Sequence, residues 1–163
     1  MLHEAPQFLV ALEQSALGAA IRQSVWAYPA ANVGHILALT LFAGSVAIMD
    51  ARLLGAFAAA PPATIVRPAR RMAAVGLLLM AATGSMLFTA EASHVALNRV
   101  FQIKATLIVL GVLNAVLVGR VLDKALEETP AFAPLPIRVR LAGLISAATW
   151  ISVAACGRLI AYF

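Results

Sequence analysis

Four long apolar runs, separated by short polar segments, dominate the chain. They cover residues 30–49, with an extension past Asp50 towards Pro61-Pro62, and then 72–92, about 101–119, and 141–163. A membrane-spanning helix needs about 20 mostly apolar residues, so each run is long enough to cross a bilayer. Backbone polar groups in hydrocarbon must bond within the segment, so we expect helices.

The segment before the first run is amphipathic. Within residues 6–26, Leu9, Leu12 and Leu17 leave Glu13 and Arg22 for another face. This pattern predicts a helix lying in the membrane interface, with a fifth, short span as the alternative. The expected fold is an all-α, integral membrane four-helix bundle with an N-terminal interfacial amphipathic helix. We expect a single membrane domain, 1–163, with transmembrane helices at about 30–56, 72–94, 100–120 and 139–161.

Composition agrees with a membrane location. Hydrophobic residues make up 63% and charged residues 12%, whereas about 25% of residues are charged in a soluble domain. The net charge of +5 would suggest nucleic acid in a soluble protein, but here it reflects Lys and Arg at helix ends, and no nucleic-acid module is present. A single cysteine, Cys156, excludes an internal disulfide and a cysteine-rich metal site.

The basic residues are unevenly distributed between the two sides. Eight lie on the side of the first and third loops and four on the other: Arg52, Arg67, Arg70, Arg71, Arg120, Lys124, Arg138 and Arg140 against Arg22, Arg99, Lys104 and Arg158. Cytoplasmic loops carry the excess of Lys and Arg. We therefore expect a multi-pass protein of the bacterial inner (plasma) membrane with both termini periplasmic.

Two histidines, His35 and His94, fall near the outer ends of the first and second runs. Histidines on two helices can be the axial ligands of a haem, and Lys104 or Arg99 could then neutralise its propionates. If Asp50 and Arg71 mark the same membrane plane at the inner ends of the two runs, the imidazole rings of His35 and His94 differ in height by about 12 Å, too far for one iron. An extension of the first helix past Asp50 would reduce that difference. The structural alternative is that each histidine bonds a neighbouring helix or interfacial water.

Other polar residues suggest less specific roles. Glu91 and His94 form Glu-x-x-His, so Glu91 could orient a histidine, pair with Lys104, or join His35 and His94 around one copper or zinc ion. We expect Asp50 and Arg52 to form an interfacial ion pair or loop anchor. Asn114 should bond between helices, and Gly111, Ala115 and Gly119 form a stripe of small residues expected to pack closely against another helix. The third histidine, His3, lies in the N-terminal segment.

The chain also carries a recognisable pattern in its first run: Tyr28-Pro29, His35, Gly44, and an exit made by Asp50, Arg52 and Gly55; Phe101, Lys104 and Asn114 follow in the third run. This pattern resembles a family of small, poorly characterised bacterial membrane proteins. More distantly, the layout is similar to copper-resistance membrane proteins of the CopD type and to four-helix b-type cytochromes.

Together these features favour a membrane-embedded b-type haem subunit that passes electrons between an outer-face donor, such as a periplasmic redox protein, and quinone or a partner subunit. Haem b would be held by His35 and His94. The alternative is a non-redox membrane protein, either copper-handling or a structural or accessory subunit with no cofactor. No phosphate-binding loop or nucleophile elbow is present, so a stand-alone hydrolase is not indicated.

Overall fold

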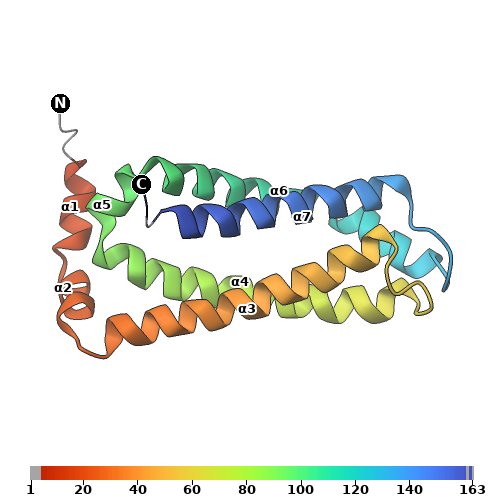
Figure 1. Ribbon diagram of the computed structural model, residues 1–163, viewed down its shortest axis with the longest axis horizontal. Helices are drawn as coiled ribbons and strands as arrows, with labels where there is room; N and C mark the ends of the chain where they lie inside the picture. The colour runs from red at the N-terminus through yellow and green to blue at the C-terminus, as the bar shows by residue number, and fades with distance from the viewer. Residues whose placement is uncertain (1–4, 161, 163) are drawn as a thin grey trace.

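The computed structural model, which describes residues 5–160 and 162, consists of two long helical hairpins and three short helices at one end (Figure 1). In the described residues the helices are α1 (Gln7–Glu13), α2 (Ala16–Gln23), α3 (Ala27–Leu54), α4 (Pro62–Ala90), α5 (Ala92–Leu97), α6 (Arg99–Glu128) and α7 (Ile137–Leu159), and these residues form no strand. The expected all-α fold is confirmed.

Within the described residues, four helices are long and apolar enough to cross a membrane: α3, α4, α6 and α7. Helix α3 packs along α4 to form one hairpin, and α6 packs along α7 to form the other; α3 also contacts α7, which joins the hairpins. The chain is therefore a multi-pass membrane protein built on a four-helix bundle.

The hairpins are tied together at the end that carries the α3–α4 and α6–α7 loops. A buried apolar cluster there takes Leu53 from α3, Val66 from α4, Leu122 and Leu126 from α6, and Val139 from α7. This cluster draws on all four long helices, so it fixes their spacing at the loop end.

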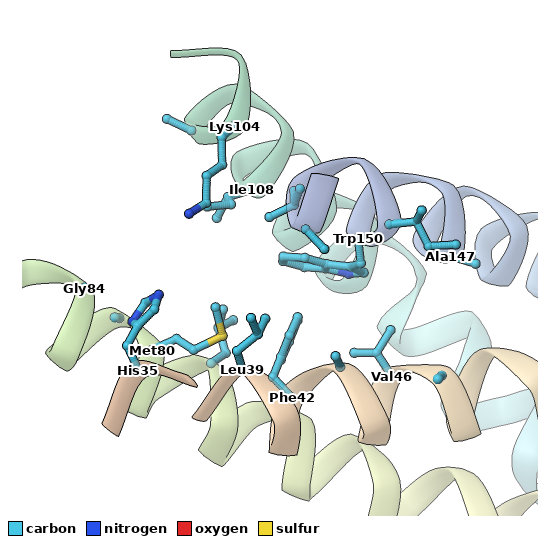
Figure 2. A pocket seen from close by; sticks show the side chains of 18 of the residues that line it. His35, Leu39, Phe42, Val46, Met80, Gly84, Lys104, Ile108, Ala147 and Trp150 are labelled. Atoms are coloured by element: carbon cyan, nitrogen blue, oxygen red, sulfur yellow. The ribbon is translucent and has the colours of Figure 1, made fainter. Parts of the chain in front are cut away.

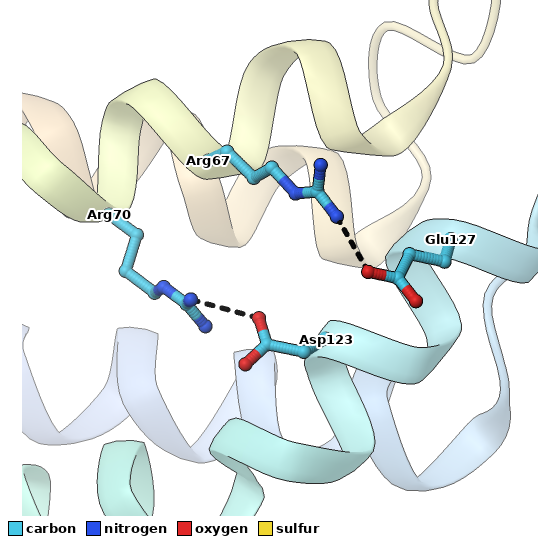
Figure 3. A network of polar contacts seen from close by, with 4 residues as sticks. All are labelled: Arg67, Arg70, Asp123 and Glu127. Atoms are coloured by element: carbon cyan, nitrogen blue, oxygen red, sulfur yellow. Dashed lines mark hydrogen bonds and ion pairs between the residues drawn. The ribbon is translucent and has the colours of Figure 1, made fainter.

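Two ion pairs lie beside this cluster and connect α4 to α6 (Figure 3). Arg67 Nη2 lies 3.0 Å from Glu127 Oε1, and Arg70 Nη2 lies 2.8 Å from Asp123 Oδ1. Their side chains are 44–69% exposed, and exposed pairs contribute only about 0.2–1 kcal/mol each. The ion pairs therefore set the register of α4 on α6, and the apolar cluster supplies most of the stability.

At the opposite end, α1, α2 and α5 lie across the ends of the long helices (Figure 1). Arg22 Nη1 of α2 donates to the carbonyl oxygen of Ala90, the last residue of α4, at 2.9 Å. Glu13 of α1 accepts hydrogen bonds from both the backbone N–H, at 2.9 Å, and the hydroxyl of Ser93 in α5. These contacts satisfy backbone groups that a helix end leaves without partners.

Several helix boundaries differ from those expected. Helix α4 begins at Pro62, ten residues before the expected 72, because proline is tolerated in the first turn of a helix; Pro68 lies inside the helix. The expected helix 72–94 is divided, because Glu91 leaves the helical conformation at φ −139° and ψ 34°. The expected interfacial helix 6–26 is also two helices, separated where Ser15 Oγ accepts from Gly18 N and caps α2.

Candidate functional site

A cavity of about 770 Å³ lies between the two hairpins and takes residues from all four long helices (Figure 2). Its polar lining residues are His35 and Asp50 of α3, Ser85 of α4 and Lys104 of α6; the others are apolar or glycine, among them Phe42, Met80, Phe88, Phe101, Ile108 and Trp150. Pockets of this size, mostly apolar with a few polar groups, are typical binding sites for small molecules.

The imidazole of His35 is held against α4. Its Nδ1 lies 2.9 Å from Thr83 Oγ1, and the Thr83 hydroxyl donates its own hydrogen to the Leu79 carbonyl oxygen at 2.7 Å. Because that hydrogen is already used, Thr83 Oγ1 accepts from His35 Nδ1–H. The neutral ring therefore carries its proton on Nδ1 and leaves Nε2 as a free acceptor.

Gly84 provides the space that this ring occupies. A Cβ atom added at Gly84 would lie 3.2 Å from His35 Cε1, which is a tight contact. His35 itself lies in the cavity wall. Thr83 and Gly84 together fix which way the imidazole faces.

Lys104 reaches the same end of the cavity from the other hairpin. Figure 2 shows its side chain pointing from α6 towards the side of the cavity where His35 lies. Its Nζ lies against Gly157 of α7, where an added Cβ would be 3.6 Å away. The sequence suggested that Lys104 could pair with Glu91. Instead it lines the cavity, and Glu91 accepts a hydrogen bond from the Tyr28 hydroxyl at 3.0 Å.

Aromatic side chains form much of the apolar wall. Phe42 and Trp150 pack edge to face with ring centroids 4.5 Å apart, and Phe88 and Phe101 stack with centroids 5.5 Å apart. Sequence reasoning missed Trp150 as a site residue. No periodicity within one helix could reveal it, because its contact with Phe42 depends on how the two hairpins pack.

The structure does not bring His94 or Arg99 into this cavity. His94 is exposed in the short helix α5, and Arg99 is exposed at the first residue of α6. His35 is level with Thr83 and Gly84, and α4 continues six residues further, about 9 Å, before it ends. Of the four residues expected to bind a cofactor, His35 and Lys104 therefore line one cavity and the other two lie outside it.

The copper or zinc site considered for His35, His94 and Glu91 is not formed. No group of three or more His, Cys, Asp or Glu side chains in the described chain is placed to hold a metal ion. The break at Glu91 explains this result, because it turns Glu91 and His94 away from the helix that packs against His35. The third histidine, His3, lies outside the residues that the structure describes.

Asp50 and Arg52 do not form the expected ion pair. Both are buried, at 2% and 1% exposure, and they lie two residues apart, on different faces of α3. Arg52 Nη2 donates to the Ala60 carbonyl oxygen at 3.0 Å, so Arg52 does anchor the first loop. Both oxygens of Asp50 are buried without a hydrogen-bond partner in the described structure, and Asp50 lines the cavity.

Fold and site together define a class: multi-pass membrane proteins in which two helical hairpins enclose an apolar cavity with polar groups at each end. Comparison with protein families shows that residues 10–163 match the family of unknown function DUF6644. The chain belongs to this family, which agrees with the resemblance seen in the sequence. Comparisons with curated proteins and with solved structures found no match.

Proposed function

We propose that this protein binds quinone in the membrane and holds it while electrons pass between the quinone and a redox protein at the outer face. The observation that carries the proposal is the placement of His35 and Lys104, which reach one end of an otherwise largely apolar cavity from opposite hairpins.

The chemistry of the two side chains complements both redox forms of a quinone. Lys104 donates N–H groups to a quinone carbonyl oxygen, and His35 Nε2 accepts the O–H of the reduced form. Oxidation of the quinol releases two electrons and two protons: the proton of the hydroxyl at this end moves to His35 Nε2 and that of the other hydroxyl moves to water, while Thr83 accepts from Nδ1–H and keeps the ring in place. The electrons pass to or from the partner's redox centre.

The rest of the cavity suits the apolar part of such a ligand. Phe88 and Phe101 flank the polar end, and Leu39, Ile108 and Trp150 continue the wall away from it. A quinone dissolved in the bilayer has already left water, so the apolar wall binds its ring and chain by van der Waals packing and not by a further hydrophobic gain. Selectivity for the quinone headgroup therefore depends on the polar end of the cavity.

Tryptophan fluorescence tests the proposal. Trp150 lines the cavity, whereas Trp26 is 80% exposed, so a Trp26→Phe background leaves Trp150 as the reporter. Titration with a decyl-substituted benzoquinone should quench Trp150 saturably. Lys104→Met should weaken binding of the quinone about tenfold or more, since a hydrogen bond to a charged group contributes about 1.5–3 kcal/mol, and His35→Ala should weaken binding of the reduced quinol, whose O–H His35 accepts. His94→Ala is the matched control. Equal quenching in all four proteins would contradict the proposal.

Haem b is the second candidate, and the contact between His35 and Thr83 favours it. A histidine that binds iron through Nε2 commonly donates Nδ1–H to a second group, which is the arrangement at Thr83. His35 would be the axial ligand and Lys104 would face a propionate. A Soret band in the purified protein that disappears in His35→Ala and persists in His94→Ala would support one-histidine ligation. Loss of the Soret band in both His35→Ala and His94→Ala would support the haem with two histidine ligands that the sequence predicted.

A further inference from the structure

Asp50 lies in the cavity wall, and the proposed function does not use it. The residue belongs to α3, fifteen residues from His35, so the two are about 22 Å apart along the helix. Asp50 is 2% exposed, and both carboxyl oxygens are buried without a hydrogen-bond partner in the described structure. An ionisable side chain placed this way inside a membrane protein is a functional candidate.

The neighbours of Asp50 do not compensate a negative charge. From α7, the Ser146 hydroxyl lies close enough to the carboxyl group to interact with it, although the contact does not have the geometry of a hydrogen bond, and one neutral hydroxyl does not balance a negative charge. On its own helix, Arg52 points to the Ala60 carbonyl oxygen. The remaining ionisable residues of the cavity wall, His35 and Lys104, are at its other end.

The other charged residues of α4 and α6 near this end are paired elsewhere or exposed. Arg67 pairs with Glu127, Arg70 with Asp123 and Lys124 with Glu128, and Arg71 and Arg120 are exposed. In the described structure Asp50 therefore has no ion-pair partner on its own helix or on those packed around it. Neither carboxyl oxygen has surface exposed to water in this structure, so only water that moves in from the adjoining cavity can solvate its charged form.

We propose that Asp50 is a proton-binding site coupled to occupancy of the cavity: it is ionised when water fills the cavity and takes up a proton when an apolar ligand displaces that water. Burying an isolated carboxylate in an apolar medium is so costly that the group takes up a proton instead. The step is a simple transfer, in which one solvent proton bonds to a carboxylate oxygen and no other bond changes. The inference uses the proposed function only in taking quinone as the apolar ligand.

Linkage makes this coupling measurable. Suppose that binding the ligand takes up one proton at Asp50. At pH values where Asp50 of the free protein is already ionised, the affinity for the ligand must then fall about tenfold for each unit by which the pH rises. Asp50→Asn carries no ionisable group and has nearly the shape of the protonated acid. Its affinity should therefore equal that of the wild type at low pH and stay high as the pH rises.

The experiment measures the affinity for the decyl-substituted benzoquinone by Trp150 quenching as a function of pH, in the Trp26→Phe background. We expect the pH dependence to disappear in Asp50→Asn and to persist in Asp123→Asn, whose carboxylate is half-exposed and ion-paired. A dependence that persists in Asp50→Asn would arise from His35 or Lys104 and would overturn the inference while leaving quinone binding intact. A wild-type affinity that does not change with pH would overturn it in the same way.

A second arm does not need quinone binding. Dicyclohexylcarbodiimide dissolves in bilayers and adds to protonated carboxyl groups, so it should modify Asp50 in the purified protein, less as the pH rises, with Asp123 unmodified. If the quinone does not bind, the proposed function fails, and this labelling alone decides about the proton site. Absence of the adduct at Asp50 at low pH would then overturn it.

Discussion

A Cβ atom added at Gly76 of α4 would lie 2.9 Å from the Cα of Phe42 in α3. Real Cβ atoms are almost never found this close to backbone, so only glycine allows the two helices to approach as they do. Phe42 also contacts Trp150 of α7. The contact at Gly76 therefore fixes the α3–α4 hairpin and one aromatic wall of the cavity together.

Gly76→Ala should destabilise the protein. The added methyl group must push α3 and α4 apart, and overpacking of this kind typically costs about 1–3 kcal/mol. We expect a lower midpoint of thermal unfolding in detergent.

Gly44→Ala is the matched control, because no atom lies within 4 Å of a Cβ added there. It should be neutral or slightly stabilising, since alanine is preferred to glycine within a helix. Equal midpoints for the two variants would show that the hairpin does not depend on close approach at Gly76.

The predicted stripe of small residues on α6 is only partly correct. A Cβ added at Gly111 would lie 2.8 Å from Trp150 Cζ2, so Gly111 does pack closely. Ala115 is exposed, and nothing lies within 4 Å of a Cβ added at Gly119. Gly111→Leu should therefore lower the yield of folded protein, whereas Gly119→Leu should be tolerated. Similar losses for both would mean that Gly119 also faces a helix.

Attachment of the N-terminal helices should weaken in acid. The hydroxyl and backbone N–H of Ser93 donate to the Glu13 carboxylate, and these hydrogen bonds hold the pKa of Glu13 below its usual value. A carboxyl group with a lowered pKa stabilises the fold above its unfolded-state pKa, and the stabilisation is lost as the pH falls towards the lowered value. Proteolysis within α1 should therefore speed up below about pH 4.5.

Glu13→Gln provides the control for this effect. The variant should be cleaved faster than the wild type at neutral pH, and its cleavage should depend little on pH over the same range. If its profile were identical to that of the wild type, the acid sensitivity would have to come from another group.

Sequence patterns predicted the membrane fold well and the site only in part. Long apolar runs determine how many helices cross the bilayer, and Asn114 was correctly expected to bond between helices; its Nδ2 donates to the Ala142 carbonyl oxygen at 3.2 Å. The break at Glu91 was not predictable from periodicity, because Arg22 and Glu13 stabilise it from a distant segment. This break keeps His94 out of the cavity.

The cavity itself depends on how the hairpins meet. His35 could be identified as an ionisable group in an apolar helix, but its position in one cavity with Lys104 rather than with His94 depends on how the α3–α4 and α6–α7 hairpins meet. Asp50 lies close to Arg52 in sequence, and an ion pair between them was the natural prediction. Residues two apart in an α-helix point to different faces, so the side chains of Asp50 and Arg52 are separated and Asp50 lines the cavity.

Photoaffinity labelling in native membranes tests the central claim most directly. An azido-benzoquinone should attach to peptides that contain cavity residues of α3, α6 and α7, such as His35, Lys104 and Trp150, and unlabelled quinone should compete with it. Lys104→Met, which removes the donor to the quinone carbonyl, should reduce this labelling. Labelling confined to exposed positions outside the cavity wall, such as Val116 and Leu117, and unaffected by competitor would contradict the account.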